Sequence, residues 1–290
     1  MTLHQLLNEG TGRLKRAGNP EAAGDARRLL LEAFRLDTVH FLMNRMEPLG
    51  CEEGIQQAAD DYRKMIEKRC RRIPLQYILG CQEFMGLNFQ VDSHVLIPRQ
   101  DTETLVELVL QEQKDQNKKV LDLCTGSGCI AISLAVLGGC YDVTATDISP
   151  EAIKVAEKNA AKLLKEGQKI RFLQGDLLDA LKEQETYDIL VSNPPYIPTQ
   201  IIRGLEPEVR DHEPLLALDG DQDGLSFYRR IAKDAGTILN PGGAIYLEIG
   251  HDQAEAVKAL LEEAGFSDIR VVKDLPGKDR VIRGDLSRNR

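Results

Sequence analysis

The sequence contains no tryptophan, and its six cysteines form no Cys-x-x-Cys pair. Closely paired cysteines are the usual sign of a disulfide framework or a zinc site, so their absence favours free thiols in a reducing compartment. The five histidines are scattered and lack the spacing that metal ligands require. We therefore expect no metal site, and we interpret the histidines as structural or surface residues.

Two further absences concern membranes and nucleic acids. No stretch of about 18 apolar residues occurs, and the first residues, Met1-Thr2-Leu3-His4, contain no apolar signal core. The formal net charge is -9, whereas proteins that grip phosphate backbones need clustered lysine and arginine. We expect a cytoplasmic, monomeric protein that contacts no membrane and whose main partner is not a nucleic acid.

The 290 residues are enough for one large or two modest domains, and the pattern changes twice along the chain. Residues 1–74 predict a small helical domain for substrate recognition, because apolar residues recur on one helical face and no catalytic constellation occurs. The basic run at 68–72 fits either contact with an acidic partner or a solvated helix end. Pro74 then ends the helical pattern. Residues 75–97 predict a β-hairpin linker, with Tyr77-Ile78-Leu79 in extended form.

Residues 98–290 alternate strands with helices, which predicts an α/β fold with a mostly parallel, doubly wound sheet covered on both faces. The strand at 120–123 leads into Cys124-Thr125-Gly126-Ser127-Gly128, where glycines let the backbone approach a ligand at a helix N-terminus. The next strand ends in Asp147, which is suited to accept hydrogen bonds from ribose hydroxyls. Asp176, after the third strand, fits either a contact with an adenine amine or a simple turn.

A fourth strand, residues 187–192, leads into Asn193-Pro194-Pro195-Tyr196. Ligand sites of open α/β sheets lie beyond the carboxyl ends of the strands. Asparagine offers a side-chain carbonyl, and two prolines donate no N–H, so nearby carbonyls lack local donors. Beside the flat face of Tyr196, these acceptors suit a planar NH2 group. The alternative is a plain loop, since Asn-Pro and Pro-Pro are turn signals.

A glycine loop alone fits a nicotinamide dehydrogenase, a flavoprotein or a methyltransferase. With Asn-Pro-Pro-Tyr added, the chain resembles class I methyltransferases dependent on S-adenosylmethionine that modify planar amino or amide nitrogens. Over its whole length it resembles the HemK/PrmC family of release factor glutamine N5-methyltransferases. The residues that carry this resemblance are Pro74-Leu75-Gln76-Tyr77-Ile78-Leu79-Gly80, Glu83-Phe84-Met85-Gly86-Leu87, Ile97-Pro98-Arg99, Asp101-Thr102-Glu103, Asp122-Leu123, Thr125-Gly126-Ser127-Gly128, Asn193-Pro194-Pro195-Tyr196-Ile197, Glu213-Pro214, Ala217-Leu218, Asp223-Gly224-Leu225 and Gly277-Lys278-Asp279-Arg280-Val281.

The resemblance implies a Rossmann-like class I methyltransferase domain at 98–290, with S-adenosyl-L-methionine as cofactor and peptide-chain release factors as protein substrates. The reaction would methylate the side-chain amide of the glutamine in their Gly-Gly-Gln motif. Two alternatives stay open. The Asn-Pro-Pro-Tyr motif also occurs in methyltransferases acting on adenine or guanine amines of nucleic acids. A dinucleotide-binding oxidoreductase or a non-catalytic binding module would leave this motif without a role.

The resemblance also implies a role for each site residue. Cofactor contacts are expected from Cys124, Thr125, Gly126, Ser127, Gly128, Asp147, Ile148, Asp176, Leu177 and Asn193. The catalytic motif would be Asn193, Pro194, Pro195 and Tyr196: the Asn193 side chain and the Pro194 carbonyl would accept the two amide N–H groups, and Tyr196 would pack against the amide plane. Cys124 departs from the family by replacing the usual first glycine of the loop, which bears on how closely the backbone approaches the cofactor.

Overall fold

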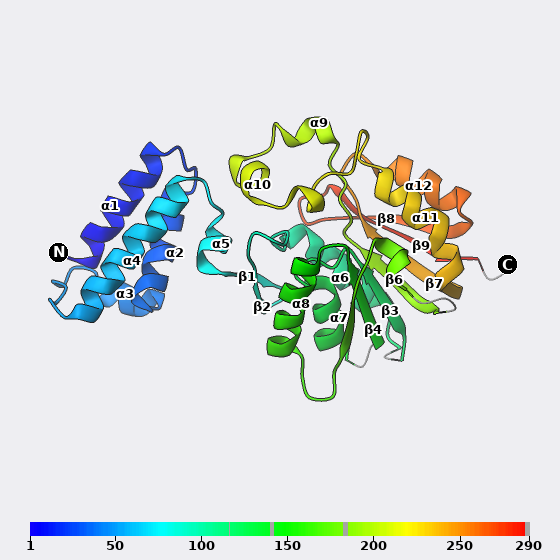
Figure 1. Ribbon diagram of the computed structural model, residues 1–290, viewed down its shortest axis with the longest axis horizontal. Helices are drawn as coiled ribbons and strands as arrows, with labels where there is room; N and C mark the ends of the chain where they lie inside the picture. Colours follow the sequence, from blue (N-terminus) through cyan, green and yellow to red (C-terminus); the bar gives the residue numbers. More distant parts are fainter. Residues whose placement is uncertain (116, 140–141, 182–184, 288–290) are drawn as a thin grey trace. The chain divides into compact units, whose positions relative to one another are not determined.

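The computed structural model describes residues 1–290 except 116, 140–141, 182–184 and 288–290, so Cys140 lies outside the described residues. The described chain forms two compact units, whose elements are labelled in Figure 1. One unit comprises Met1–Gly80 and Glu206–His212, and the other comprises Cys81–Leu205 and Glu213–Arg290. The boundaries expected after residues 74 and 97 remain predictions. No helix in the described part is long and apolar enough to cross a membrane.

The helical unit has its own apolar core. Leu6 and Leu14 of the first helix are fully buried against Leu29 and Leu30 of the second. The first helix begins with a capping box, in which Thr2 and Gln5 bond each other's backbone N–H groups. The pattern of apolar residues therefore predicted this helical region correctly. Its helices are α1 (Leu3–Arg16), α2 (Ala22–Phe34), α3 (Thr38–Asn44), α4 (Glu53–Cys70) and α5 (Leu75–Leu79).

The expectation that Tyr77-Ile78-Leu79 is extended was wrong, because these residues lie in α5. Pro74 precedes the first turn, where its fixed φ and missing N–H are tolerated. Gly80 ends the helix in the left-handed conformation, with φ of 75°. These two end signals and the burial of Leu75 outweigh the β preference of the residues between them. The hairpin itself is confirmed over a shorter range, since β1 (Cys81–Phe84) pairs antiparallel with β2 (Leu87–Gln90).

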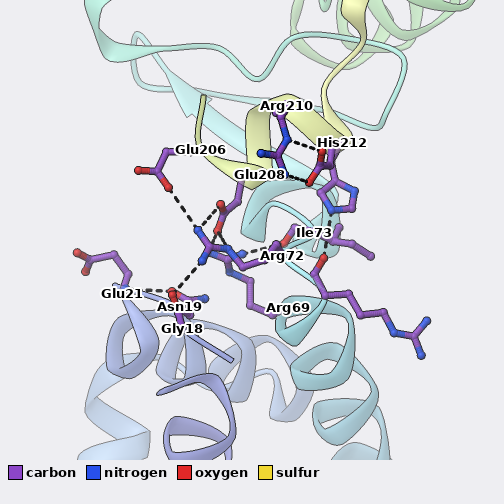
Figure 2. Close-up of polar contacts among 12 residues, drawn as sticks. Gly18, Asn19, Glu21, Arg69, Arg72, Ile73, Glu206, Glu208, Arg210 and His212 are labelled. Carbon is purple, nitrogen blue, oxygen red and sulfur yellow. Dashed lines mark hydrogen bonds and ion pairs between the residues drawn. The ribbon is translucent and has the colours of Figure 1, made fainter. Parts of the chain in front are cut away.

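The segment Glu206–His212, which contains α10 (Pro207–His212), belongs to the helical unit despite its late position in the chain. Figure 2 shows its acidic side chains meeting the basic end of α4. Arg72 donates to both Glu208 oxygens, from Nε at 2.7 Å and from its terminal nitrogen at 2.6 Å. Buried Arg69 pairs with Glu208 at 2.8 Å and with Asp25 at 2.6 Å. The basic run at 68–72 thus meets acidic residues of its own chain.

The second unit is built on a sheet with the strand order β5-β4-β3-β6-β7-β9-β8. The strands from β3 to β7 pair in parallel, and β9 is antiparallel to both of its neighbours. The order reverses between β3 and β6, which is where open α/β sheets bind ligands. The strands are β3 (Lys119–Leu123), β4 (Asp142–Asp147), β5 (Ile170–Gln174), β6 (Tyr187–Ser192), β7 (Leu239–Glu248), β8 (Phe266–Lys273) and β9 (Asp279–Leu286).

Helices cover both faces of this sheet, as Figure 1 shows, so the predicted α/β class and doubly wound arrangement are confirmed. Alternate strand residues supply the two cores: Val120 and Ile189 face one layer, and Leu121 and Leu190 face the other. The first layer contains α6 (Gln100–Glu112), α7 (Cys129–Gly138) and α8 (Pro150–Leu163). The second contains α11 (Ser226–Ile238) and α12 (Ala254–Glu263), and shorter helices η1 (Leu177–Ala180), α9 (Thr199–Ile202) and η2 (Leu215–Ala217) lie in the connections.

Candidate active site

A cavity of about 200 Å³ lies at the carboxyl ends of β3, β4 and β6 in the sheet unit. This is the position that the reversal of strand order predicts. The predicted site residues Gly128, Pro194 and Tyr196 do not contribute to its described lining. The structure brings the others together around it: Cys124, Thr125, Gly126, Ser127, Asp147, Ile148, Asp176, Leu177, Asn193 and Pro195.

Asp122, a fully buried residue of β3, holds the loop that follows this strand. Its Oδ2 accepts hydrogen bonds from Thr125 Oγ1 at 2.6 Å and from the Ala131 backbone N–H at 3.2 Å. Burial raises the pKa of the Asp122 carboxyl to about 7, against the effect of these two hydrogen bonds. The sequence placed Asp122 in a motif but assigned it no role; a carboxyl inside a buried strand was the available signal.

Two positions show why this loop favours small residues. A Cβ at Gly128 would lie 2.9 Å from Ile132 Cδ1 and 3.2 Å from Ala156 Cβ, and φ there is 80°. Glycine is therefore needed for the loop to pack against α7 and α8. Cys124 has φ of 59°, in the left-handed region where glycine is unstrained. Cys124, which stands where the family usually has glycine, therefore carries a side chain in a backbone conformation that favours glycine. Burial raises the pKa of the Cys124 thiol, so it is neutral.

Asp147 ends β4 and joins the two loops of the cavity. Its Oδ2 accepts from the Gly126 backbone N–H and its Oδ1 from the Ser149 backbone N–H, both at 2.9 Å. Burial raises its pKa despite these bonds. Each carboxyl oxygen keeps a second lone pair, so the side chain can still accept from ribose hydroxyls. Ile148 beside it is 45% exposed and offers apolar surface to the cavity.

Asp176 and Leu177, which follow β5, form another part of the cavity wall. Asp176 precedes η1, in agreement with the turn interpretation, and its side chain pairs with Arg230 of α11 at 2.8 Å. Leu177 is buried and has φ of 52°. Arg230 also lines the cavity. It was missed because nothing in the sequence of α11 links it to the turn after β5.

The Asn-Pro-Pro-Tyr segment is held by side chains from three other elements. Asn193 Nδ2 donates to Thr102 Oγ1 of α6 at 3.3 Å, and the Tyr196 hydroxyl donates to Glu248 Oε1 at the end of β7, also at 3.3 Å. Gln253 Nε2 donates to the Tyr196 carbonyl at 3.0 Å. Asn193 and Pro195 line the cavity, while Tyr196 is partly buried and packs against the apolar core of the second layer.

Sequence reasoning gave no role to Thr102, Glu248 or Gln253 in this segment. Glu248 was visible as a lone acidic residue in the apolar run 244–249, yet its partner could not be inferred. Among the described residues, no group of three or more His, Cys, Asp or Glu side chains is placed to hold a metal ion.

A doubly wound sheet with a glycine loop after β3, an acidic residue ending β4 and Asn-Pro-Pro-Tyr after β6 defines a class I methyltransferase. Residues 99–202 match the Methyltransferase small domain, and residues 5–80 match the PrmC N-terminal domain. A solved methyltransferase structure from Pyrococcus furiosus has the same fold, with a TM-score of 0.54 at 18% identity over 76% of this chain and 98% of that one.

Relatives extend this match to the full length. A release factor glutamine methyltransferase from Clostridium botulinum is 41% identical, covering 98% of this chain and 99% of the relative. One from Moorella thermoacetica is 45% identical, covering 97% of this chain and 98% of the relative. The chain therefore belongs to the release factor glutamine methyltransferase family, and the family resemblance inferred from its motifs is confirmed.

Proposed function

We propose that this protein transfers the methyl group of S-adenosylmethionine to the side-chain amide nitrogen of the glutamine in the Gly-Gly-Gln motif of peptide-chain release factors. The observation that carries the proposal is the Asn193 side chain. Its NH2 group is engaged by Thr102, so its carbonyl remains to accept from a substrate amide at the cavity. Full-length relatives that bear this activity in their names support the same substrate.

The cavity lining fits the cofactor chemically. Asp147 provides acceptors for ribose hydroxyls, and the backbone of Gly126 can be approached closely because a Cβ there would meet nothing within 4 Å. Asp176 offers an acceptor for the adenine amine, and Leu177 and Ile148 provide apolar contacts. When bound, S-adenosylmethionine supplies an electrophilic methyl group on a sulfonium.

The residues of the motif would act on the amide nitrogen, which is a poor nucleophile because its lone pair is delocalised into the carbonyl. Asn193 Oδ1, at the cavity, would accept one of its N–H groups. The Pro194 carbonyl, although Pro194 lies outside the described lining, would accept the other, as the family resemblance implies. Both contacts favour a more pyramidal nitrogen. The same acceptors stabilise the positive charge that develops there, which is preorganised electrostatic stabilisation. Holding the nitrogen in line with the methyl group lowers the activation barrier further, because the reacting atoms are already oriented. The methylated nitrogen then loses a proton to water, so no side-chain base is required.

We also propose that the helical unit binds the release factor away from the reacting glutamine. It matches the PrmC N-terminal domain, and none of the described residues that line the cavity belongs to it. Because release factors act in translation, we place the reaction in the cytoplasm. We also expect the enzyme to be monomeric.

The test uses the full-length protein, radiolabelled S-adenosylmethionine and three acceptors: a purified release factor, the same factor with the Gly-Gly-Gln glutamine changed to alanine, and duplex DNA. We expect label only in the unchanged factor. Asn193→Ala should lower the single-turnover rate by about 100-fold with the cofactor saturating, as loss of one preorganised contact does in other active sites. Label in DNA would instead favour a base amino-methyltransferase. Label in the alanine-substituted factor would place the reaction at another residue.

A further inference from the structure

We propose that Glu248 is a positioning residue, which acts through the Thr102 hydroxyl to set which end of the Asn193 amide faces the substrate. The inference rests on the proposed function of this site. It assigns a role to a carboxyl that does not contribute to the described lining of the cavity and therefore acts through its neighbours.

Glu248 lies at the end of β7 and is 1% exposed. Its Oε1 accepts from the Tyr196 hydroxyl at 3.3 Å, and its buried Oε2 has no hydrogen-bond partner among the described residues. The side chain of Thr102 lies close enough to lower the pKa of the carboxyl. Thr102, in the first turn of α6, is 2% exposed and lines the cavity. Its Oγ1 is also 3.3 Å from Asn193 Nδ2. The Thr102 hydroxyl thus has both the Glu248 carboxyl and the Asn193 amide as neighbours.

The direction of these bonds follows from counting protons. An ionised carboxylate only accepts, and threonine has a single hydroxyl proton. If that proton is directed to Glu248, the Thr102 oxygen can only accept from Asn193. The Asn193 amide must then present its NH2 group to Thr102 and its carbonyl to the cavity. A reversed amide would put two acceptors, Thr102 Oγ1 and Asn193 Oδ1, against each other and would present N–H donors to the substrate N–H groups.

The charge state of Glu248 makes this arrangement sensitive to pH. Burial raises the pKa of the Glu248 carboxyl to about 7, and the nearby Thr102 side chain, the Arg280 charge and the Tyr196 hydroxyl oppose that rise. Asp101 of α6 adds to it, and Tyr228 and Cys129 are further titratable groups that interact with Glu248. Arg280 is itself paired with Asp101 at 3.0 Å and with Asp274 at 3.1 Å. A protonated Glu248 can donate, so it no longer dictates the direction of the Thr102 hydroxyl.

The test compares two matched pairs of variants in single-turnover methylation of a release factor, with cofactor affinity measured separately by calorimetry. Thr102→Val keeps the shape but removes the hydroxyl, whereas Thr102→Ser keeps it. We expect Thr102→Val to lower the rate by about 100-fold, the effect of a misplaced reacting group, and Thr102→Ser to stay within about threefold of the unmodified enzyme. Glu248→Leu should resemble Thr102→Val, and Glu248→Gln, which like a protonated Glu248 can donate as well as accept, should be slower than Thr102→Ser. Cofactor affinity should change less than about twofold in all four, since binding and chemistry separate in this assay.

The pH profile provides a readout that a purely structural role would not change. The rate of the unmodified enzyme should fall roughly eightfold from pH 7.5 to 6, as expected for one essential group that titrates near 7. The Glu248→Gln enzyme should lack this fall. A Thr102→Val enzyme as fast as Thr102→Ser, or an unchanged pH profile in Glu248→Gln, would overturn the inference.

A second measurement separates this inference from the proposed function. The side-chain NH2 resonances of Asn193 should move in Glu248→Leu, although Glu248 acts on Asn193 only through Thr102. If the unmodified protein does not label a release factor, the proposed function fails, and the NMR comparison still decides whether Glu248 orients Asn193. Unmoved Asn193 resonances in Glu248→Leu would refute the positioning role, whatever the substrate. If Glu248→Leu does not fold, Thr102→Val and Thr102→Ser give the same NMR comparison.

Discussion

Replacing Glu208 by glutamine should release the segment Glu206–His212 from the helical unit. The Glu208 carboxyl receives two hydrogen bonds from Arg72, at 2.7 and 2.6 Å, and pairs with Arg69 at 2.8 Å (Figure 2). Burial alone would raise the pKa of Glu208, but the hydrogen bonds from Arg72 and Arg69 lower it. Glutamine keeps the size of the side chain but loses the charge and one acceptor oxygen, so both arginines lose part of their partner.

The size of the effect follows from burial. The side chains of Glu208, Arg69 and Arg72 are 16%, 7% and 20% exposed. Removing one partner of a fully buried ion pair costs about 3–5 kcal/mol. Because Arg69 keeps Asp25 and Arg72 is partly solvated, we expect about 2–3 kcal/mol for Glu208→Gln. Glu206→Gln is the matched control: its carboxyl contacts the same Arg72 at 3.4 Å but is 75% exposed, so its loss should cost less than about 0.5 kcal/mol.

Two measurements check this prediction. Chemical denaturation followed by circular dichroism compares the free energies of unfolding of the two variants. Amide hydrogen exchange read by mass spectrometry compares local opening, which should rise in peptides covering 206–212 in Glu208→Gln only. If Glu208→Gln and Glu206→Gln have equal stability and equal exchange in this segment, the ion pairs at the end of α4 do not hold it.

Three further predictions concern the sheet unit. Asp147→Ala should weaken S-adenosylmethionine binding by about 1.5–3 kcal/mol, the range for hydrogen bonds to a charged group, and Asp147→Asn by less; unchanged affinity in calorimetry would remove Asp147 from the site. Cys124→Gly should stay within about 1 kcal/mol of the unmodified protein, since relief of the φ of 59° offsets the loss of packing, whereas β-branched Cys124→Val should lose at least about 1–2 kcal/mol; equal thermal stability of the two would contradict this. The pKa of Glu248, raised by burial from 4.5 to about 7, means that the folded protein binds more protons than the unfolded chain between these values, so stability should fall as pH rises through them. About 3 kcal/mol of that fall should vanish in Glu248→Gln, as seen by denaturation at pH 5 and pH 8.

Much of the sheet unit could be predicted because its signals are local. Alternating strands and helices indicated the doubly wound sheet, and the glycine loop, Asp147 and Asn-Pro-Pro-Tyr each follow a strand directly. Parallel strands place their carboxyl ends at one edge of the sheet, so these separate motifs had to converge there. Knowledge of which strands are neighbours was not required for that step.

The tertiary structure alone decided which side chains hold these motifs in place. Asn193 and Thr102 lie 91 positions apart, Tyr196 and Glu248 52 apart, and Arg72 and Glu208 136 apart. Such pairs depend on strand order and helix packing, which local propensity does not encode. The same holds for α5, where end signals and the burial of Leu75 against the helical core overrode the β preference of Tyr77-Ile78-Leu79. The sequence by itself therefore indicated which motifs meet at the cavity, whereas the packing of distant elements determined how their side chains are held.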